Sequence, residues 1–87
     1  MIVLITGASA GFGEEMARIF VRNGHRVIAA ARRSERLASL HAELGDALLP
    51  IALDVTQDDA IAAALAVLPE AWQPIDVLIN NAGLALG

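Results

Sequence analysis

The chain has 87 residues, 56% of them hydrophobic, so it forms at most one small domain, whose composition suits part of a larger α/β core. Its net charge of −4 argues against a nucleic-acid or anionic-membrane surface, and zero cysteines exclude disulfides and thiolate metal sites. No apolar run approaches the roughly 18 residues of a membrane span, and no secretory signal precedes the first predicted strand, so we expect a cytoplasmic protein.

A glycine-rich segment follows the first predicted strand. Ile2–Ile5 is apolar and rich in β-branched residues, which indicates a buried parallel strand. Residues 6–13, Thr-Gly-Ala-Ser-Ala-Gly-Phe-Gly, then lead into a helix. A strand that turns through glycines into a helix can hold a phosphate, because Gly7 permits the tight turn and Gly11 and Gly13 permit close approach of backbone and helix. The first N–H groups of such a helix have no internal partner. An ordinary glycine loop remains the alternative.

Helices and strands alternate along the rest of the chain. Three helices are expected: one with Met16, Ile19 and Phe20 on its apolar face that ends near Asn23–Gly24, one from the cap Ser34 to Gly45 with Leu37, Leu40 and Leu44 on one face, and one begun by Thr56 and built on Ile61, Leu65 and Leu68. The expected strands after the first are Val27–Ala31, Leu48–Asp54 and Asp76–Asn80. A loop, Pro69–Pro74, precedes the last of them. Gly24 and Gly45 are natural left-handed helix stops. Pro50 donates no ladder hydrogen bond, so we expect the third strand to lie at a sheet edge or to begin at this residue.

This alternation predicts an α/β fold of the Rossmann type, a doubly wound parallel sheet with strand order 3-2-1-4 and three helices. Right-handed crossovers place the first two helices on one face of the sheet. A ligand crevice is then expected outside the carboxyl ends of strands one and four. Residues 7–13 and 80–83 would face each other across it.

Two arginines end the second strand, at a point where dinucleotide folds often carry an acidic residue for the ribose hydroxyls. Arg32 and Arg33 suit a ribose 2′-phosphate, because guanidinium groups make bidentate charge-assisted hydrogen bonds with phosphate. We therefore expect NADP rather than NAD. The alternative is a pair of solvated arginines, one of them paired with Glu35.

Polar residues also end the third and fourth strands. Asp54 can accept a hydrogen bond from an adenine amino group while Val55 contacts the base, or Asp54 can cap the next helix. Asn80 and Asn81 carry both donors and an acceptor, so one can tie neighbouring strand ends together while the other contacts a ribose. The segment 80–83 is equally compatible with a simple turn.

Three further residues are expected to have no role in chemistry. His25 and His41 lie far apart without metal-ligand partners at a useful spacing, so we expect surface residues and no metal site. Trp72, the single tryptophan, is expected to be a packing residue.

With Thr-Gly-x-x-x-Gly-x-Gly at 6–13, Arg-Arg at 32–33, Asp-Val at 54–55 and Asn-Asn-Ala-Gly at 80–83, the chain resembles the short-chain dehydrogenase/reductase family over all 87 residues. Segments 1–4, 32–37 and 80–87 are most similar to its NADP-dependent 3-hydroxy acid dehydrogenases, which also oxidise serine and allo-threonine. The resemblance implies contacts to the pyrophosphate and nearby ribose from Gly7, Ala8, Ser9, Ala10, Gly11 and Phe12, to the 2′-phosphate from Arg32 and Arg33, to the adenine from Asp54 and Val55, and to a ribose from Asn81. It implies structural roles for Thr6 and Asn80.

The chain departs from the family pattern in two respects, one in the glycine motif and one in the catalytic residues. NADP-using relatives often carry a basic residue where this chain has Ala10, so cofactor choice would rest on Arg32 and Arg33 alone. The family's catalytic tyrosine, the lysine four residues after it and the catalytic serine are also missing, because the chain has no tyrosine or lysine and Ser34 and Ser39 lie by the second helix.

We therefore expect residues 1–87 to form an incomplete dinucleotide-binding domain with no catalytic residue of its own, inactive alone, with an exposed strand edge. The complete enzyme is expected to act on a small 3-hydroxy acid and to form a homo-oligomer. The alternatives are a non-catalytic nucleotide-binding module that needs a partner chain and a truncated product.

Overall fold

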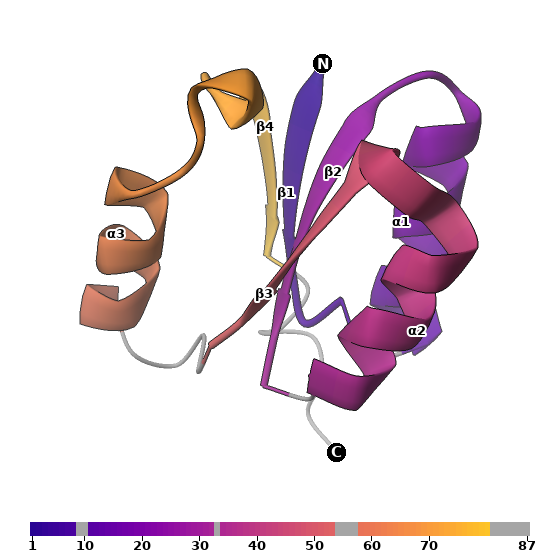
Figure 1. Ribbon diagram of the computed structural model, residues 1–87, viewed down its shortest axis with the longest axis horizontal. Coiled ribbons are helices and arrows are strands. Elements are labelled where there is room, and N and C mark those ends of the chain that lie inside the picture. The colour runs from indigo at the N-terminus through magenta and orange to yellow at the C-terminus, as the bar shows by residue number, and fades with distance from the viewer. Residues whose placement is uncertain (9–10, 33, 54–57, 81–87) are drawn as a thin grey trace.

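Four strands and three helices alternate along the chain in the computed structural model, which describes residues 1–8, 11–32, 34–53 and 58–80 (Figure 1). In chain order they are β1 (Ile2–Thr6), α1 (Gly11–Arg22), β2 (Arg26–Ala31), α2 (Ser34–Leu44), β3 (Leu48–Ala52), α3 (Asp58–Ala66) and β4 (Val77–Asn80). Short 3₁₀ turns at Gly45–Ala47 and Glu70–Trp72 precede β3 and β4.

The strands form one parallel sheet in the order β3-β2-β1-β4, which confirms the predicted topology. β3 lies at an edge, as Pro50 predicted. The order reverses at β1, because β2 and β3 extend the sheet to one side while β4 returns to the other. In this arrangement a crevice is expected at the carboxyl ends of β1 and β4.

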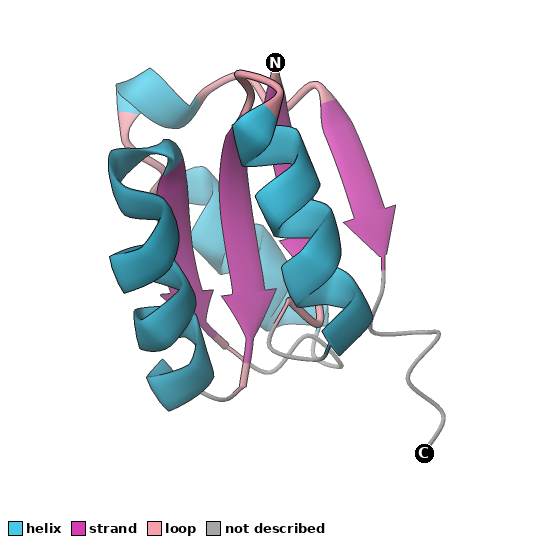
Figure 2. Cartoon of the chain, turned by 90° about the vertical axis from the view of Figure 1, so that its right-hand side faces the viewer, coloured by secondary structure: helices cyan, strands magenta, loops and turns pink. Residues whose placement is uncertain are grey.

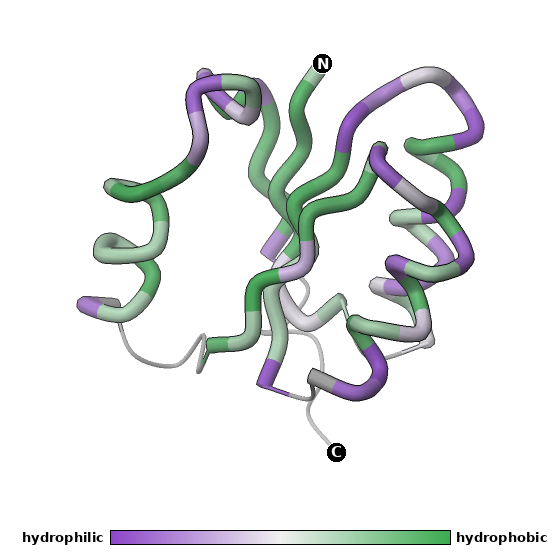
Figure 3. The backbone as a smooth tube through the Cα atoms, in the orientation of Figure 1, coloured by the Kyte–Doolittle hydropathy of each residue, from purple (hydrophilic) through white to green (hydrophobic). Residues whose placement is uncertain are grey.

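Each face of the sheet carries its own apolar cluster, and the two clusters take alternate residues of the strands. Val3, Ile5, Val27 and Ala29 pack toward α1 and α2, together with Leu37 and Leu40 from α2. On the opposite face, Ile2, Leu4, Ile28 and Ala30 form a second cluster with Leu68 and Trp72, which follow α3 in the chain. Figure 2 shows α1 and α2 side by side in front of the sheet, and Figure 3 shows the apolar strands between the helical layers. Both faces of the central strands are buried, which explains their continuous apolar runs.

Glycines in the left-handed region end the first two helices, as predicted. Gly24 has φ +88° and Gly45 has φ +71°. Around Gly24 the N–H of His25 donates to the Phe20 carbonyl at 3.0 Å, and the N–H of Gly24 donates to the Val21 carbonyl at 3.0 Å. These are the two hydrogen bonds of a Schellman motif, and the His25 ring meets the Phe20 ring edge-on with centroids 6.0 Å apart.

Several boundaries and exposures differ from the sequence prediction. α1 begins at Gly11, so the second and third glycines belong to the helix, and its buried face runs through Gly13 and Ala17 while Ile19 is 44% exposed. Gly13 and Ala17 are four residues apart and so lie on one face of the helix, and Ile19 lies to the side of that face. β3 ends at Ala52 rather than at position 54, although the N–H of Leu53 still donates to the Ala31 carbonyl at 2.9 Å.

The remaining differences concern helix ends and the two histidines. α2 includes Ser34 as its first residue instead of its cap, α3 ends two residues before Leu68, and β4 begins at Val77. Differences of one or two residues are common where terminal hydrogen bonds are absent. Both histidines are half-buried rather than on the open surface: Nδ1 of His41 lies 2.9 Å from the Leu48 carbonyl oxygen, and His25 packs on Phe20.

The predicted loop at 69–74 is folded onto the amino end of β2. Trp72 is 8% exposed, which confirms its packing role, and the Arg26 guanidinium lies 4.0 Å from the centroid of its ring system. Arg26 also donates to the Ala71 carbonyl. None of the helices within the described ranges has the length and apolar character needed to cross a bilayer.

Candidate functional site

The carboxyl edge of the sheet gathers the described part of the predicted site. β1 ends at Thr6, and a turn through Gly7 and Ala8 leads toward α1. Gly7 has φ +68°, a conformation that strongly favours glycine, so the predicted turn is confirmed. The N–H of Ala8 donates to the Ala30 carbonyl at 3.2 Å, which attaches the turn to the end of β2.

The first two residues of α1, Gly11 and Phe12, are exposed at the same edge. Gly11 is exposed, and a Cβ atom built on it would meet no other atom within 4 Å. Phe12 beside it is 73% exposed. The N–H groups of a first helical turn have no partner within the helix, and the positive end of the helix dipole lies there. The backbone at Gly11 therefore has room for an anionic group, which fits a pyrophosphate.

A side-chain hydrogen bond connects the carboxyl ends of β1 and β4 at this edge. Thr6 and Asn80 are register partners on these strands, and the Thr6 hydroxyl donates to Oδ1 of Asn80 at 2.9 Å. Thr6 is 4% exposed and also lies 3.5 Å from the Ile79 carbonyl oxygen. The expectation that one asparagine ties strand ends together is thus met by Asn80.

Arg32 follows the last residue of β2 and is exposed. It makes no ion pair with any residue in the described ranges, Glu35 included. An exposed guanidinium at the carboxyl end of β2 has donors available for a phosphate.

The other predicted contacts lie outside the described residues. They are Ser9, Ala10, Arg33, Asp54, Val55 and Asn81. Their roles stay predictions. The five described members of the predicted set, Gly7, Ala8, Gly11, Phe12 and Arg32, all lie at the edge where the first two strands end.

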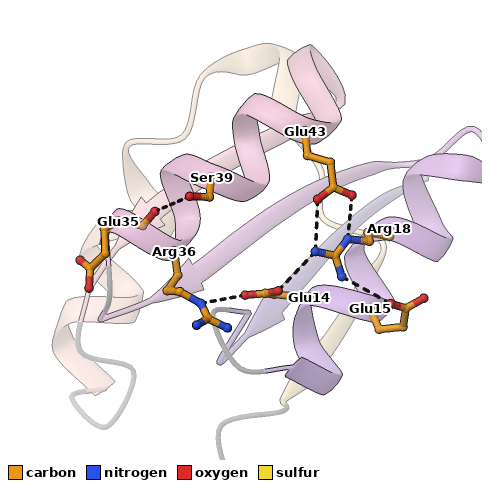
Figure 4. Close-up of polar contacts among 7 residues, drawn as sticks. All are labelled: Glu14, Glu15, Arg18, Glu35, Arg36, Ser39 and Glu43. Carbon is orange, nitrogen blue, oxygen red and sulfur yellow. Dashed lines mark hydrogen bonds and ion pairs between the residues drawn. The ribbon is translucent and has the colours of Figure 1, made fainter.

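A charged cluster joins α1 to α2, and the sequence analysis assigned no role to it (Figure 4). Arg18 is bound by Glu43 through Nε at 2.7 Å and Nη2 at 3.2 Å, and it also contacts Glu15 and Glu14 at 3.4 Å. Nε of Arg36 donates to the remaining Glu14 oxygen at 3.1 Å. Bonded partners in the cluster are up to 25 positions apart in the chain, so only the packing of α1 against α2 could reveal it.

The contact between Arg18 and Glu43 shifts the pKa of both side chains. Hydrogen bonding to Glu43 raises the pKa of Arg18 above its ordinary range despite partial desolvation, and the charges of Glu43 and Glu14 act in the same direction. Hydrogen bonding to Arg18 lowers the pKa of Glu43. Both groups are therefore charged at neutral pH. Among the described residues, no three acidic, histidine or cysteine side chains gather as a metal site would require.

Comparison with known proteins shows extended similarity. A family model described as short chain dehydrogenase matches residues 1–87. The chain is 62% identical over its whole length to the "probable NADP-dependent dehydrogenase in aabA 3′ region" of Dichelobacter nodosus, of which it covers 82%. It is 61% identical, again over all 87 residues, to the NADP-dependent 3-hydroxy acid dehydrogenase YdfG of Salmonella typhi, but spans only 35% of that protein.

The fold agrees with that of a solved relative. The closed form of serine dehydrogenase complexed with NADP⁺ superposes with a TM-score of 0.86 and 55% sequence identity, over 90% of this chain and 32% of that one. The present chain thus spans about a third of the length of the 3-hydroxy acid dehydrogenase and the serine dehydrogenase that it matches.

Proposed function

Because this chain belongs to the short-chain dehydrogenase family, we propose that it forms the NADP-binding N-terminal part of an oxidoreductase acting between NADP(H) and the hydroxyl or carbonyl carbon of a small 3-hydroxy acid. The observation that carries the proposal is that the left-handed Gly7, the exposed Gly11 at the start of α1 and the exposed Arg32 lie at one edge of the sheet. The names of the relatives, an NADP-dependent 3-hydroxy acid dehydrogenase and a serine dehydrogenase complexed with NADP⁺, support the cofactor and the substrate class.

Different residues would bind different parts of the cofactor. Backbone N–H groups at the start of α1 would hold the pyrophosphate, with Gly7 to Phe12 forming its surroundings. Arg32 and Arg33 would bind the 2′-phosphate, Asp54 and Val55 the adenine, and Asn81 a ribose. Bound NADP(H) supplies or accepts the hydride. The hydrogen bond between Thr6 and Asn80 would keep the two strand ends at a constant separation beneath it.

In the family, proton transfer uses a tyrosine and the lysine four residues after it, and this chain has neither residue type. We therefore propose that residues 1–87 bind the cofactor but do not turn over substrate alone. They would act as an incomplete dinucleotide-binding domain within a longer, cytoplasmic and homo-oligomeric enzyme.

The test is a titration of the protein with NADPH and with NADH. Tighter binding of NADPH is expected, and Arg32→Gln should reduce that preference roughly tenfold because a charge-assisted hydrogen bond is lost. Arg22→Gln is the matched control, because it removes an equal charge from the far end of α1. Equal affinity of the unsubstituted protein for the two cofactors would contradict the assignment.

A nucleotide-binding module that needs a partner chain is the second candidate. It is favoured by β4, which pairs with β1 within the described part of the chain and leaves Leu78 63% exposed. Figure 2 shows this strand at the side of the sheet, beyond the two helices in front. A stable complex with a different chain on gel filtration would favour this candidate, and self-association would favour the enzyme.

A further inference from the structure

The first turns of α1 and α2 are joined by one ion pair at the edge where the cofactor is proposed to bind. Glu14 is the fourth residue of α1 and Arg36 the third residue of α2. Nε of Arg36 donates to Oε2 of Glu14 at 3.1 Å. Arg36 follows Arg32 by four residues and lies in the first turn of the helix after β2, so both arginines are near the carboxyl end of that strand.

The Glu14 carboxylate is held in a defined position. Its side chain is only 14% exposed, and its two oxygens bind different partners, Oε1 the Nη2 of Arg18 and Oε2 the Nε of Arg36. Figure 4 shows Glu14 between these two guanidinium groups. A carboxylate bound on both oxygens cannot rotate freely, so it fixes the orientation of the more exposed Arg36.

The two arginines differ in what remains available for a ligand. All three side-chain nitrogens of Arg18 contact carboxylates, from Glu14, Glu15 and Glu43. Arg36 uses only Nε, and its two terminal nitrogens make no hydrogen bond or ion pair with a residue of the described ranges. Its side chain is 50% exposed. Arg36 therefore presents the donor edge that guanidinium uses for bidentate phosphate binding.

The position of Arg36 in its helix is also informative. A cation in a first helical turn is unfavourable, because the positive end of the helix dipole lies there. Glu14 offsets this cost from the neighbouring helix. An anion bound at the same place would be attracted by the guanidinium and by the helix end together.

We propose that Arg36 is a specificity-determining residue for the ribose 2′-phosphate, and that Glu14 is its positioning residue. Glu14 binds the Nε edge of the guanidinium and leaves the two terminal amino groups to donate to phosphate oxygens. The inference rests on the proposed NADP-binding function and adds a third cation to Arg32 and Arg33. Discrimination between NADP and NAD then depends on a contact between two helices as well as on the end of β2.

The experiment compares two small probes, adenosine 2′,5′-bisphosphate and adenosine 5′-monophosphate, by calorimetric titration. They differ only in the 2′-phosphate, so the ratio of their dissociation constants isolates this subsite. The proteins are the unsubstituted chain, Arg36→Gln, Arg36→Lys, Glu14→Gln and the double variant of Glu14→Gln with Arg36→Gln. Arg22→Gln is the control of equal charge.

Arg36→Gln should lower the preference for the bisphosphate roughly tenfold and leave binding of the monophosphate unchanged, because one charge-assisted contact is lost. Arg36→Lys should keep part of the preference. Glu14→Gln should lower it by a smaller factor, and should have no further effect once Arg36 is replaced. A purely structural role would weaken both probes together in Arg36→Gln, which would overturn the proposal.

The outcomes separate this inference from the function on which it rests. If the unsubstituted protein binds both probes equally, the NADP assignment itself is wrong. If it prefers the bisphosphate and Arg36→Gln keeps that preference within twofold, only the role of Arg36 is wrong. If Glu14→Gln still lowers the preference in the Arg36→Gln background, Glu14 does not act through Arg36.

Discussion

The Thr6 hydroxyl donates to Oδ1 of Asn80 at 2.9 Å and so joins the carboxyl ends of β1 and β4, which are separated by 74 positions in the chain. Because Thr6 is buried and β4 is an edge strand, this bond is a local determinant of how firmly the end of β4 is held. Thr6→Val should reduce the free energy of unfolding by about 0.5–1.5 kcal/mol, the usual net value of one hydrogen bond.

Hydrogen exchange tests that prediction locally. The amides of β4 should exchange faster in Thr6→Val, while those of β2 should change little. Thr6→Ser keeps the donor and is the control. If the serine and valine variants accelerate exchange in β4 to the same extent, the hydrogen bond does not hold the strand end.

The second prediction concerns the two left-handed glycines Gly7 and Gly45, with φ +68° and +71°. Replacing either by alanine should cost about 1–2 kcal/mol of stability, because the Cβ atom is strained in this region. Only Gly7→Ala should also weaken NADPH binding, since only Gly7 lies at the candidate site. Gly45 is the matched control, as a Cβ there meets no atom within 4 Å. Equal NADPH affinity in the two variants would show that the Gly7 turn does not shape the site.

The third prediction is a pH dependence of stability from Glu43. Its pKa is lowered in the folded protein by hydrogen bonding to Arg18, so its contribution is present above the ordinary carboxyl pKa and is lost as the pH falls through the lowered value. At neutral pH, Glu43→Gln should lower the urea midpoint of unfolding slightly. The difference from the unsubstituted protein should vanish at acidic pH.

Arg18→Gln provides the matched background for that test. Without Arg18 the cause of the shift is gone, so Glu43→Gln should then produce no pH-dependent difference in the urea midpoint. A difference that persists in the Arg18→Gln background would assign the pH dependence to another partner of Glu43.

The fourth prediction uses the single tryptophan as a reporter. The Arg26 guanidinium lies over the Trp72 ring at 4.0 Å from its centroid, at the amino end of β2. Arg26→Gln should cost about 0.5–1 kcal/mol through loss of the cation–π contact and shift the Trp72 emission to the red as its ring becomes more solvated. Arg26→Lys should retain part of the contact. NADPH binding should not change, because the residue lies at the edge of the sheet opposite the candidate site; a weakened affinity would contradict this placement.

Much of the fold could be predicted because its signals are local. The apolar runs of β1 and β2, the helical spacing of Leu37 and Leu40 and the left-handed stops at Gly24 and Gly45 each depend on a few neighbouring residues. The strand order followed from the doubly wound pattern, in which the fourth strand returns to the far side of the first, and the sheet has this order. Ile19 shows the limit, because its apolar character did not determine which side of α1 would be buried.

The sequence by itself determined that the glycine turn and Arg32 lie at one edge of the sheet, since residues that follow parallel strands must lie where those strands end. Tertiary structure alone decided the pairs within it, Thr6 with Asn80 and Glu14 with Arg36. Such pairs depend on the register of β1 against β4 and on the rotation of α1 against α2. Those quantities are set by packing of the whole sheet and its helices, so no short segment of the chain encodes them.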